Sequence, residues 1–241
     1  MGSNSHIYVL ENLEKKIRDE YQGSPAQSDL LETIAGLRAE FNRLRNLWNR
    51  DPHSRHLFLD LEVQTYEFAS QYMPLNRISL IYDTAELKVT PRRVMDHLSK
   101  LFDLKIIPYS LTLYGVINRS SESMQFLEAV VTYIETKRRE PMSLLAFDLP
   151  NTDEAFSKVA KLKVGVLDLQ LREGKVEGPS LLRRLIDLAE KTAAHSVKYR
   201  FKSPQSLFKN FLAYTNGLCD NLPNLVRLCV VNVHLILAAE P

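Results

Sequence analysis

The segment that decides the fold lies in the middle of the chain, at residues 104–173, and reads LKIIPYSLTLYGVINRSSESMQFLEAVVTYIETKRREPMSLLAFDLPNTDEAFSKVAKLKVGVLDLQLRE. Its hydrophobic pattern predicts a strand at 109–117, a helix at 121–139, a strand at 142–149, a short helix and a long strand at 161–172. Short apolar runs that alternate with helical segments are typical of a sheet with helices packed on it. We therefore expect the rest of the chain to cover or extend this central unit.

The helix predicted at 121–139 has signals at both of its ends. Ser121 is expected to cap its start. A basic run, Lys137-Arg138-Arg139, falls in the last turn, where cations complement the helix dipole, and Pro141 follows. The residues expected on its buried face recur at helical spacing: Met124, Leu127, Val131 and Ile134.

The N-terminal part of the chain predicts a helical hairpin. Apolar residues of 5–21 share one helical face, and Gly23-Ser24-Pro25 then breaks the chain. The second helix carries a seam of apolar residues in alternating steps of four and three: Leu30, Ile34, Leu37, Phe41, Leu44 and Trp48. Such a seam indicates a coiled coil or a tight helix pair. Because the seam is short, a packed hairpin is favoured over a free-standing coiled coil. The six seam residues are our candidates for a protein interface.

Between the hairpin and the central unit the pattern changes to a period of two. Apolar and polar residues alternate over 57–64, apart from Phe58, and predict a strand. Two further short strands are expected at 78–82 and 87–89. Thr90-Pro91 predicts a helix start, with threonine as the N-cap and proline at the first helical position.

After the central unit the pattern predicts a helix through 182–188 and a strand at 197–201. A further helix follows Pro204, and an apolar tail lies at 225–239. The predicted fold class is α+β. It has an N-terminal helical hairpin, a central mixed or antiparallel sheet with packed helices, and a C-terminal helix plus strand. The expected division is a helical arm at 1–55, an α+β body at 56–202 and an extension at 203–241.

Composition indicates an ordinary globular protein whose core is large enough to need no disulfide or structural metal for stability. The chain has 241 residues, 45% hydrophobic and 25% charged, and a net charge of +2. Cys219 and Cys229 lack metal-site spacing; two buried thiols in a reducing compartment are the simple interpretation, and a disulfide stays open. No signal peptide or membrane-spanning run is apparent, so an intracellular protein is expected. Acylation at Gly2 is also open, because the N-terminus nearly fits that signal.

Motifs for catalysis or cofactor binding are not apparent. The glycines form no phosphate-binding loop, and the Gly-x-Ser-x-Gly motif of a nucleophile elbow does not occur. His53 and His56 are interpreted as solvated surface rather than a metal site. Asp148, Asp153 and Glu154 are interpreted as a cap and first-turn charges of the next helix. We therefore expect no enzyme, no cofactor, no metal and no small-molecule substrate. A hydrolase or transferase without a recognisable motif stays open as an alternative.

Basic clusters are the more informative polar feature. Candidates for binding lipid phosphate or ribonucleoprotein are Arg92, Arg93, Lys137, Arg138, Arg139, Arg183, Arg184, Lys198 and Arg200. Each cluster alone is typical of a solvated face or a helix end. Converging on one surface, they would form a patch for a nucleic-acid backbone or an anionic membrane, worth about 1 kcal/mol per basic residue near such a surface.

Three consecutive stretches of the central unit form a further pattern. They are SLTLYGVINR at 110–119, the apolar helix 124–134 and REPMSLLAF at 139–147; a strand at 161–172 and a helix at 181–190 follow. This order resembles the matrix proteins of rhabdovirus type, over about 104–201. In that family a strand ending in polar and arginine residues leads to an apolar helix, a basic proline-containing turn and an apolar strand.

The resemblance implies a viral structural protein active in virion assembly. Such a protein self-associates and bridges a nucleocapsid to the inner face of a host membrane through its basic clusters. The chain has no Pro-Pro-x-Tyr box and begins with helices, unlike animal-virus members, so recruitment of host budding factors is not implied. The alternative is a cellular scaffold or adaptor subunit whose helical hairpin pairs with a partner protein. The seam supports both hypotheses equally.

Overall fold

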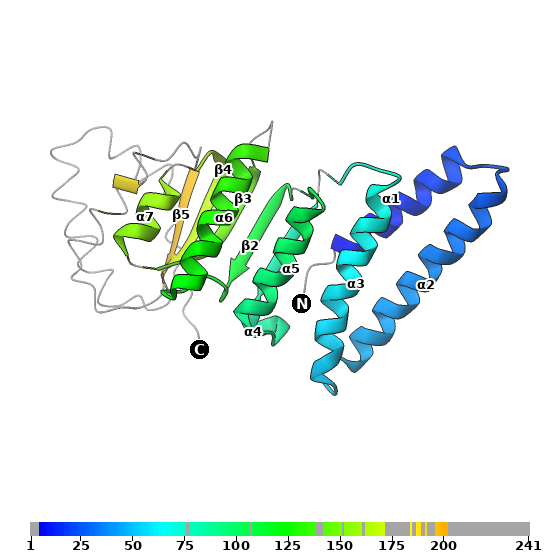
Figure 1. The fold of residues 1–241 in the computed structure, drawn as a ribbon, viewed down its shortest axis with the longest axis horizontal. Helices are drawn as coiled ribbons and strands as arrows, with labels where there is room; N and C mark the ends of the chain where they lie inside the picture. Colours follow the sequence, from blue (N-terminus) through cyan, green and yellow to red (C-terminus); the bar gives the residue numbers. More distant parts are fainter. Residues whose placement is uncertain are drawn as a thin grey trace. The chain divides into compact units, whose positions relative to one another are not determined.

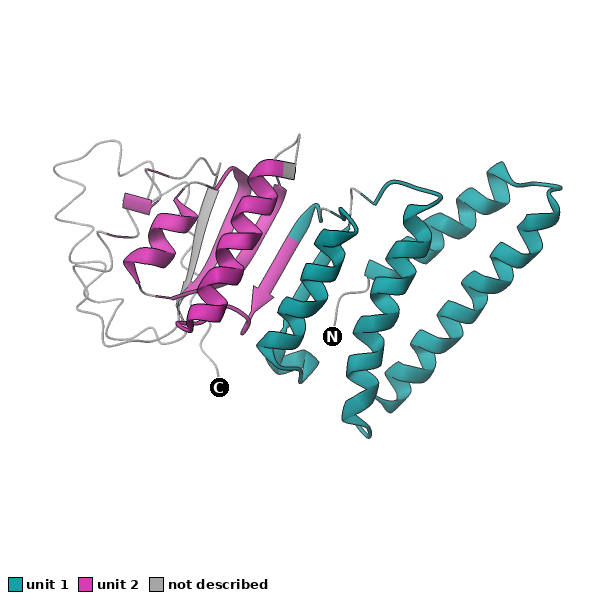
Figure 2. Cartoon of the chain, viewed as in Figure 1, with its two compact units in different colours: residues 1–110 teal, residues 111–241 magenta. Residues whose placement is uncertain are grey.

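The computed structural model of the chain describes residues 5–75, 78–106, 108–137, 142–150, 152–160, 162–171 and 196–201, with positions 184, 187, 188 and 191. For Lys137, Leu171 and 196–201 it describes the backbone alone. Seven α-helices and five strands have described bounds, and the fold class is α+β, as predicted (Figure 1). The chain divides into two compact units, residues 1–110 and 111–241 (Figure 2).

Unit 1 contains the N-terminal helices. Its elements are α1 (Ser5–Glu20), α2 (Pro25–Leu47), α3 (Pro52–Ser70), β1 (Ser79–Asp83), α4 (Thr84–Leu87) and α5 (Pro91–Asp103). The predicted hairpin is confirmed as α1 and α2, and α3 lies beside them (Figure 1). The predicted arm, 1–55, therefore falls inside a larger unit. The predicted strand at 78–82 is confirmed as β1, and the helix predicted at Thr90-Pro91 is confirmed as α5.

Three helices of unit 1 begin with the same two-residue signal, a capping side chain followed by proline. Ser24, Asp51 and Thr90 each accept a backbone N–H of the first turn. Proline then occupies the first helical position, where its missing N–H has no helical partner to lose. The start of each of these three helices is therefore determined by its local sequence.

The predicted strand at 57–64 is wrong, because this segment lies inside α3. Its buried residues recur at helical rather than alternating spacing: Phe58, Leu59, Leu61, Glu62, Thr65, Tyr66 and Ala69. Leu57, which the strand pattern required to be buried, is 38% exposed. The strand predicted at 87–89 is also wrong. Leu87 ends α4, and Lys88 takes a left-handed conformation with φ 51°.

The core of unit 1 is built around the seam of α2. Ile34, Phe41 and Leu44 are buried, whereas Leu30, Leu37 and Trp48 are half-buried. The facing helix α1 buries Val9, Leu10, Leu13 and Ile17. The seam thus packs within the unit, and the packed hairpin favoured from the sequence is confirmed.

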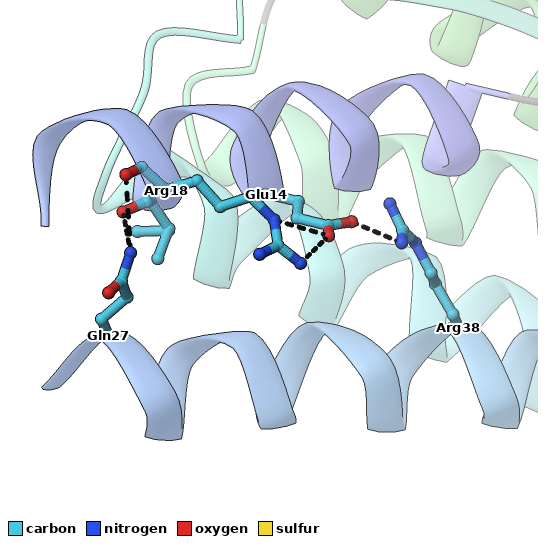
Figure 3. Close-up of polar contacts among 5 residues, drawn as sticks. Glu14, Arg18, Gln27 and Arg38 are labelled. Carbon is cyan, nitrogen blue, oxygen red and sulfur yellow. Dashed lines mark hydrogen bonds and ion pairs between the residues drawn. The ribbon is translucent and has the colours of Figure 1, made fainter. Parts of the chain in front are cut away.

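An ion pair links the polar edges of α1 and α2. Figure 3 shows Glu14 of α1 between Arg18 of the same helix and Arg38 of α2. The guanidinium of Arg38 lies 2.5 Å from one carboxylate oxygen of Glu14, and that of Arg18 lies 2.7 Å from the other. The hydrogen bond from Arg18 and the charge of Arg38 outweigh burial and hold the pKa of Glu14 below its usual value. Gln27 joins the same edge by donating to the carbonyl oxygens of Ile17 and Arg18.

Unit 2 contains a parallel sheet with helical connections. Its elements are β2 (Ser110–Tyr114), α6 (Ser121–Lys137), β3 (Met142–Leu149), α7 (Asp153–Val159), β4 (Val164–Leu171) and β5 (Ser196–Phe201), with β2 beginning at the unit boundary. The strands follow the order β2-β3-β4-β5. Each predicted strand of this region is confirmed, with β2 and β4 shorter than expected.

The pairing in unit 2 corrects the expected sheet type. β3 pairs with β4 and β4 with β5, both in parallel, so these pairs are not part of an antiparallel sheet. The reason is the connection: α7 lies between β3 and β4, and a helical crossover returns the chain to the same end of the sheet. A helix between two short apolar runs is therefore the signal for parallel pairing.

The start of α6 differs by one residue from the prediction. The hydroxyl of Ser120, not Ser121, accepts the backbone N–H of Ser123 at 3.2 Å and caps the helix. The expected interpretation of Asp153 and Glu154 is confirmed, since both lie in the first turn of α7 after the cap Thr152. Positions 184, 187, 188 and 191 are helical, in line with the helix predicted there. The helix after Pro204 and the tail at 225–239 lie outside the described residues.

Candidate protein-binding groove and buried polar cluster

A groove lies in unit 1 between α1 and the segment that joins α3 to β1. Its lining consists of Tyr8, Val9, Asn12, Lys16, Met73, Pro74, Leu75 and Ile78. Of these, Val9 and Ile78 are almost fully buried, whereas Tyr8 is 47% exposed. Ile7, the neighbour of Tyr8, is 37% exposed. A hydrophobic floor beside an exposed aromatic side chain is typical of a surface that binds another protein.

The polar groups of the groove are few and are already oriented. The Asn12 amide donates to the carbonyl oxygen of Tyr8 at 2.8 Å, one turn back on α1. The ammonium of Lys16 donates to Glu20 at 2.8 Å in an exposed pair, which contributes at most about 1 kcal/mol. Among its described lining residues the groove therefore offers mainly apolar contact area, with Lys16 as a cation and no carboxylate.

The seam residues, which were our interface candidates, lie elsewhere in unit 1. The Phe41 ring stacks on His6 at a centroid distance of 4.1 Å and meets Phe58 of α3 edge-on at 5.0 Å. Trp48 meets the same Phe58 ring edge-on at 5.1 Å. Because these aromatic contacts join α1, α2 and α3, the structure favours a core role for the seam over contact with another chain.

Arg93, a phosphate-binding candidate, is engaged inside unit 1. Its guanidinium lies 2.5 Å from the Asp60 carboxylate and also donates to the carbonyl oxygen of His56 at 3.0 Å. Lys100 donates to the same Asp60 at 3.2 Å. Burial raises the pKa of Asp60, but the hydrogen bonds and charges of Arg93 and Lys100 outweigh burial and hold it below its usual value. These contacts join α3 to α5. Arg92, the neighbouring candidate, is exposed.

The other basic candidates belong to unit 2. Arg184 forms an ion pair with Asp153 at 2.9 Å. Lys198 and Arg200 lie on β5 at register positions opposite Asp168 and Gln170 of β4. Lys137 ends α6, while Arg138, Arg139 and Arg183 lie outside the described residues. A single surface shared by all nine candidates stays a prediction.

Two aspartates of unit 2 are buried in the parallel sheet. Asp148 and Asp168 are 1% and 3% exposed. The register places them on one face of the sheet, because Asp148 pairs with Gln170 and Asp168 with Ala146. Asp148 accepts the backbone N–H of Gly115, which follows β2 in a left-handed conformation with φ 75°. Asp148 thus fixes the turn after β2. The sequence had suggested a cap of α7, and for Asp148 that interpretation is wrong, because Thr152 caps α7.

A buried polar cluster joins α3, α5 and β1 of unit 1. Glu62 and His97 are 2% and 1% exposed, and one Glu62 carboxylate oxygen lies 3.3 Å from Nε2 of His97. The other oxygen accepts the Tyr66 hydroxyl at 2.9 Å. The Tyr82 ring lies edge-on to the His97 ring, with centroids 5.4 Å apart. Burial, reinforced by the nearby Glu62 charge, raises the pKa of both tyrosines well above the usual value, so both are neutral.

Sequence reasoning missed this cluster and the groove for different reasons. Glu62 was assigned to the polar face of a strand, which hid its place on the buried face of α3. A glutamate inside an apolar helical stripe, followed four residues later by Tyr66, is the signal that could have found it. The groove joins Tyr8 to Met73 and Pro74, which are far apart in the chain. No local pattern brings such residues together.

Comparison of the chain with protein-family models, with curated proteins and with solved structures gave no match. Within the described residues, none of the helices combines the length and the apolar character needed to cross a membrane. In the same part of the chain, no three side chains of His, Cys, Asp or Glu come together in an arrangement that could hold a metal ion.

Proposed function

We propose that this chain is a non-enzymatic scaffold subunit that binds a partner protein through the groove of unit 1. The observation that carries the proposal is the groove itself, whose lining is mostly apolar and includes the exposed Tyr8. Tyrosine and methionine are enriched at protein interfaces, and lysine is depleted there. The occupant is an apolar side chain presented by a segment of the partner, anchored between Tyr8 and Met73.

The packing of unit 1 supports this proposal. The core holds α1 in place through Val9, Leu13 and Ile17, so the groove is preformed rather than assembled on binding. Preformed surfaces avoid part of the conformational cost of association. The hairpin therefore contributes to partner binding through the outer side of α1, while its seam holds the unit together.

The matrix-type role remains a second hypothesis. It requires basic side chains that are available to lipid phosphate or ribonucleoprotein. Of those candidates, Arg93 is held by Asp60 and Arg184 by Asp153, which favours the scaffold proposal. The apolar tail at 225–239, a further candidate for contacts between copies of a matrix-type protein, lies outside the described residues.

Flotation with anionic liposomes distinguishes the two proposals. The full chain is mixed at low salt with vesicles that contain a large fraction of phosphatidylserine. As a scaffold it stays at the bottom of the gradient. As a matrix-type protein it rises with the vesicles, and the bound fraction falls at high salt because exposed basic clusters are screened. Salt-sensitive flotation would replace the scaffold proposal with the matrix one.

The groove is tested by paired substitutions. A photo-crosslinking amino acid next to the groove, at Asn12, should yield a defined covalent product with one partner protein in cells. Tyr8→Ser should abolish that product, because it removes the exposed aromatic contact. Leu57→Ser is the matched control, since Leu57 is 38% exposed on α3 and does not line the groove. A product that survives Tyr8→Ser, or that is lost equally with Leu57→Ser, would count against the groove.

A further inference from the structure

Cationic side chains gather in unit 1 where α2 ends, α3 begins and α4 leads into α5. Arg50 lies in the turn between α2 and α3, Arg55 in the first turn of α3, and Lys88 directly after α4. The Arg55 guanidinium donates from Nε to the carbonyl oxygen of Trp48 at 2.9 Å and from Nη1 to that of Lys88 at 3.2 Å. The Lys88 ammonium donates to the side-chain oxygen of Asn49, the neighbour of Arg50, at 3.4 Å. We call Arg50, Arg55 and Lys88 the basic patch.

The charges of the basic patch are not neutralised within unit 1. The acceptors of its hydrogen bonds are backbone carbonyl and amide oxygens, which are neutral. Among the described residues, no carboxylate forms an ion pair with any of the three cations. Asp51, which follows Arg50 in the chain, caps α3 by accepting the backbone N–H of His53 at 2.9 Å. Asp60, further along the same helix, is held by Arg93. The patch therefore keeps a local excess of positive charge.

The basic patch is accessible and already oriented. Arg50 and Lys88 are exposed, and Arg55 is half-buried. Because two carbonyl oxygens from different segments hold the Arg55 guanidinium, little of its side-chain freedom remains to be lost when a ligand binds. A further cation, Arg92, is exposed in the first turn of α5, close in the chain to Lys88.

The size and composition of the patch indicate its ligand. Guanidinium and ammonium groups bind carboxylates and phosphates through charge-assisted hydrogen bonds. A nucleic-acid strand is typically held by about 6–10 phosphate contacts, often together with aromatic rings that stack on bases. The patch is smaller than that, and the nearby Trp48 ring packs edge-on against Phe58. A short cluster of carboxylates therefore matches the patch better than a nucleic-acid strand does.

We propose that Arg50, Arg55 and Lys88 form a binding site for a short acidic segment of a partner protein. Carboxylates of that segment replace solvent at the exposed ammonium and guanidinium groups. The site lies at the start of α3, whereas the groove is lined by residues that follow the end of the same helix. The two sites are separate, so this proposal does not depend on the groove or on its occupant.

Fluorescence anisotropy on the full chain tests the proposal with a short labelled peptide in which glutamate alternates with glycine. The same peptide with glutamine in place of glutamate is the ligand control. The wild type should bind the acidic peptide in preference to the glutamine peptide, and added salt should weaken binding by screening the charges. Arg50→Gln combined with Lys88→Gln should raise the Kd by about tenfold, because each lost exposed contact contributes up to about fivefold.

Lys15→Gln combined with Lys105→Gln is the matched control, because it removes the same charge from exposed positions outside the patch. Lys105 has a left-handed backbone with φ 58°, and Lys88 has one with φ 51°, so the two lysine substitutions are made in the same local conformation. The control variant should bind the acidic peptide as the wild type does. Failure of the wild type to prefer the acidic peptide, or an equal loss of binding in both double variants, would overturn the proposal.

Two further measurements complete the test. A labelled oligonucleotide of thymidine should bind more weakly than the acidic peptide. Tighter binding of the oligonucleotide, lost in the patch variant alone, would identify a nucleic-acid site and overturn the proposal. Circular dichroism compares the folding of all variants. If the patch double variant does not fold, Arg50→Gln alone, at an exposed position, should raise the Kd for the acidic peptide by a few-fold, and an unchanged Kd would overturn the proposal.

Discussion

At the scale of single residues, two glycines within regular elements have opposite surroundings. A Cβ added at Gly165 in β4 would lie 2.7 Å from the carbonyl oxygen of Ser143 in β3. That oxygen belongs to the backbone of the paired strand and has little freedom to move. Gly36 lies within α2, and an added Cβ there would have no heavy atom within 4 Å. The first glycine is required by strand packing, and the second is not.

We predict opposite effects of alanine at these two positions. Gly165→Ala should lower the free energy of unfolding by about 1–3 kcal/mol, because the strands must separate to admit the methyl group. Gly36→Ala should raise it by about 0.5–1 kcal/mol, because alanine has the higher helix propensity. Urea unfolding followed by circular dichroism measures both. Equal stability of Gly165→Ala and the wild type would contradict the close approach of β3 and β4.

A second prediction at this scale concerns Asp60. Because Arg93 and Lys100 hold its pKa below the usual value, the carboxylate stabilises the fold above about pH 3.9, the unfolded value. This contribution is lost as pH falls through the lower, folded value. Asp60→Asn should therefore destabilise the chain at pH 7, and the difference from wild type should shrink at about pH 3. Asp29→Asn, at an exposed position of α2, serves as the control. A difference that persists unchanged at low pH would argue against the ion pair.

Among the helices and strands, helix starts were predictable where a capping residue and a proline occur together. This signal has to be preferred over a short alternating pattern that follows it. Thr90-Pro91 was interpreted as the start of α5 and is confirmed. Asp51-Pro52 carries the same signal and starts α3, yet the chance alternation over 57–64 suggested a strand there. A local cap determines backbone geometry directly, whereas alternation over a few residues does not.

Sheet type could not be predicted in the same way. The strand positions follow from apolar runs and were found, but pairing direction depends on where the chain returns after each helix. Of the candidate site residues, those of the seam were identified because they recur at regular helical spacing. The position of the seam in the core depends on α3, which supplies Phe58 to the aromatic group. The segment of α3 that contains Phe58 had been predicted as a strand.

The seam gives the prediction at the element scale. Phe41→Asp should unfold unit 1, because it places a carboxylate among the rings of His6 and Phe58. Leu37→Asp should cost less, because Leu37 is half-buried and its carboxylate can reach water. Circular dichroism and thermal unfolding compare the two. A folded Phe41→Asp chain that differs from wild type only in self-association would assign the seam to an interface between chains.

In the molecule as a whole, α1, α2 and α3 pack into one preformed core, and the seam of α2 is internal to it. The scaffold proposal depends on it, since the groove is held in shape by that core. The rival interpretation, in which the seam contacts another chain, predicts the same sequence pattern but a different response to concentration. An interface is populated by mass action, whereas an internal core is not.

Hydrogen exchange on the full chain, measured over a roughly hundredfold range of protein concentration, distinguishes an internal seam from an interface. We expect the amides around Ile34, Phe41 and Leu44 to be protected as strongly as those around Leu13 in α1 and Tyr66 in α3, with the same rates at every concentration. Seam amides that exchange rapidly in dilute protein and become protected only as the concentration rises would show that the seam is an interface between chains.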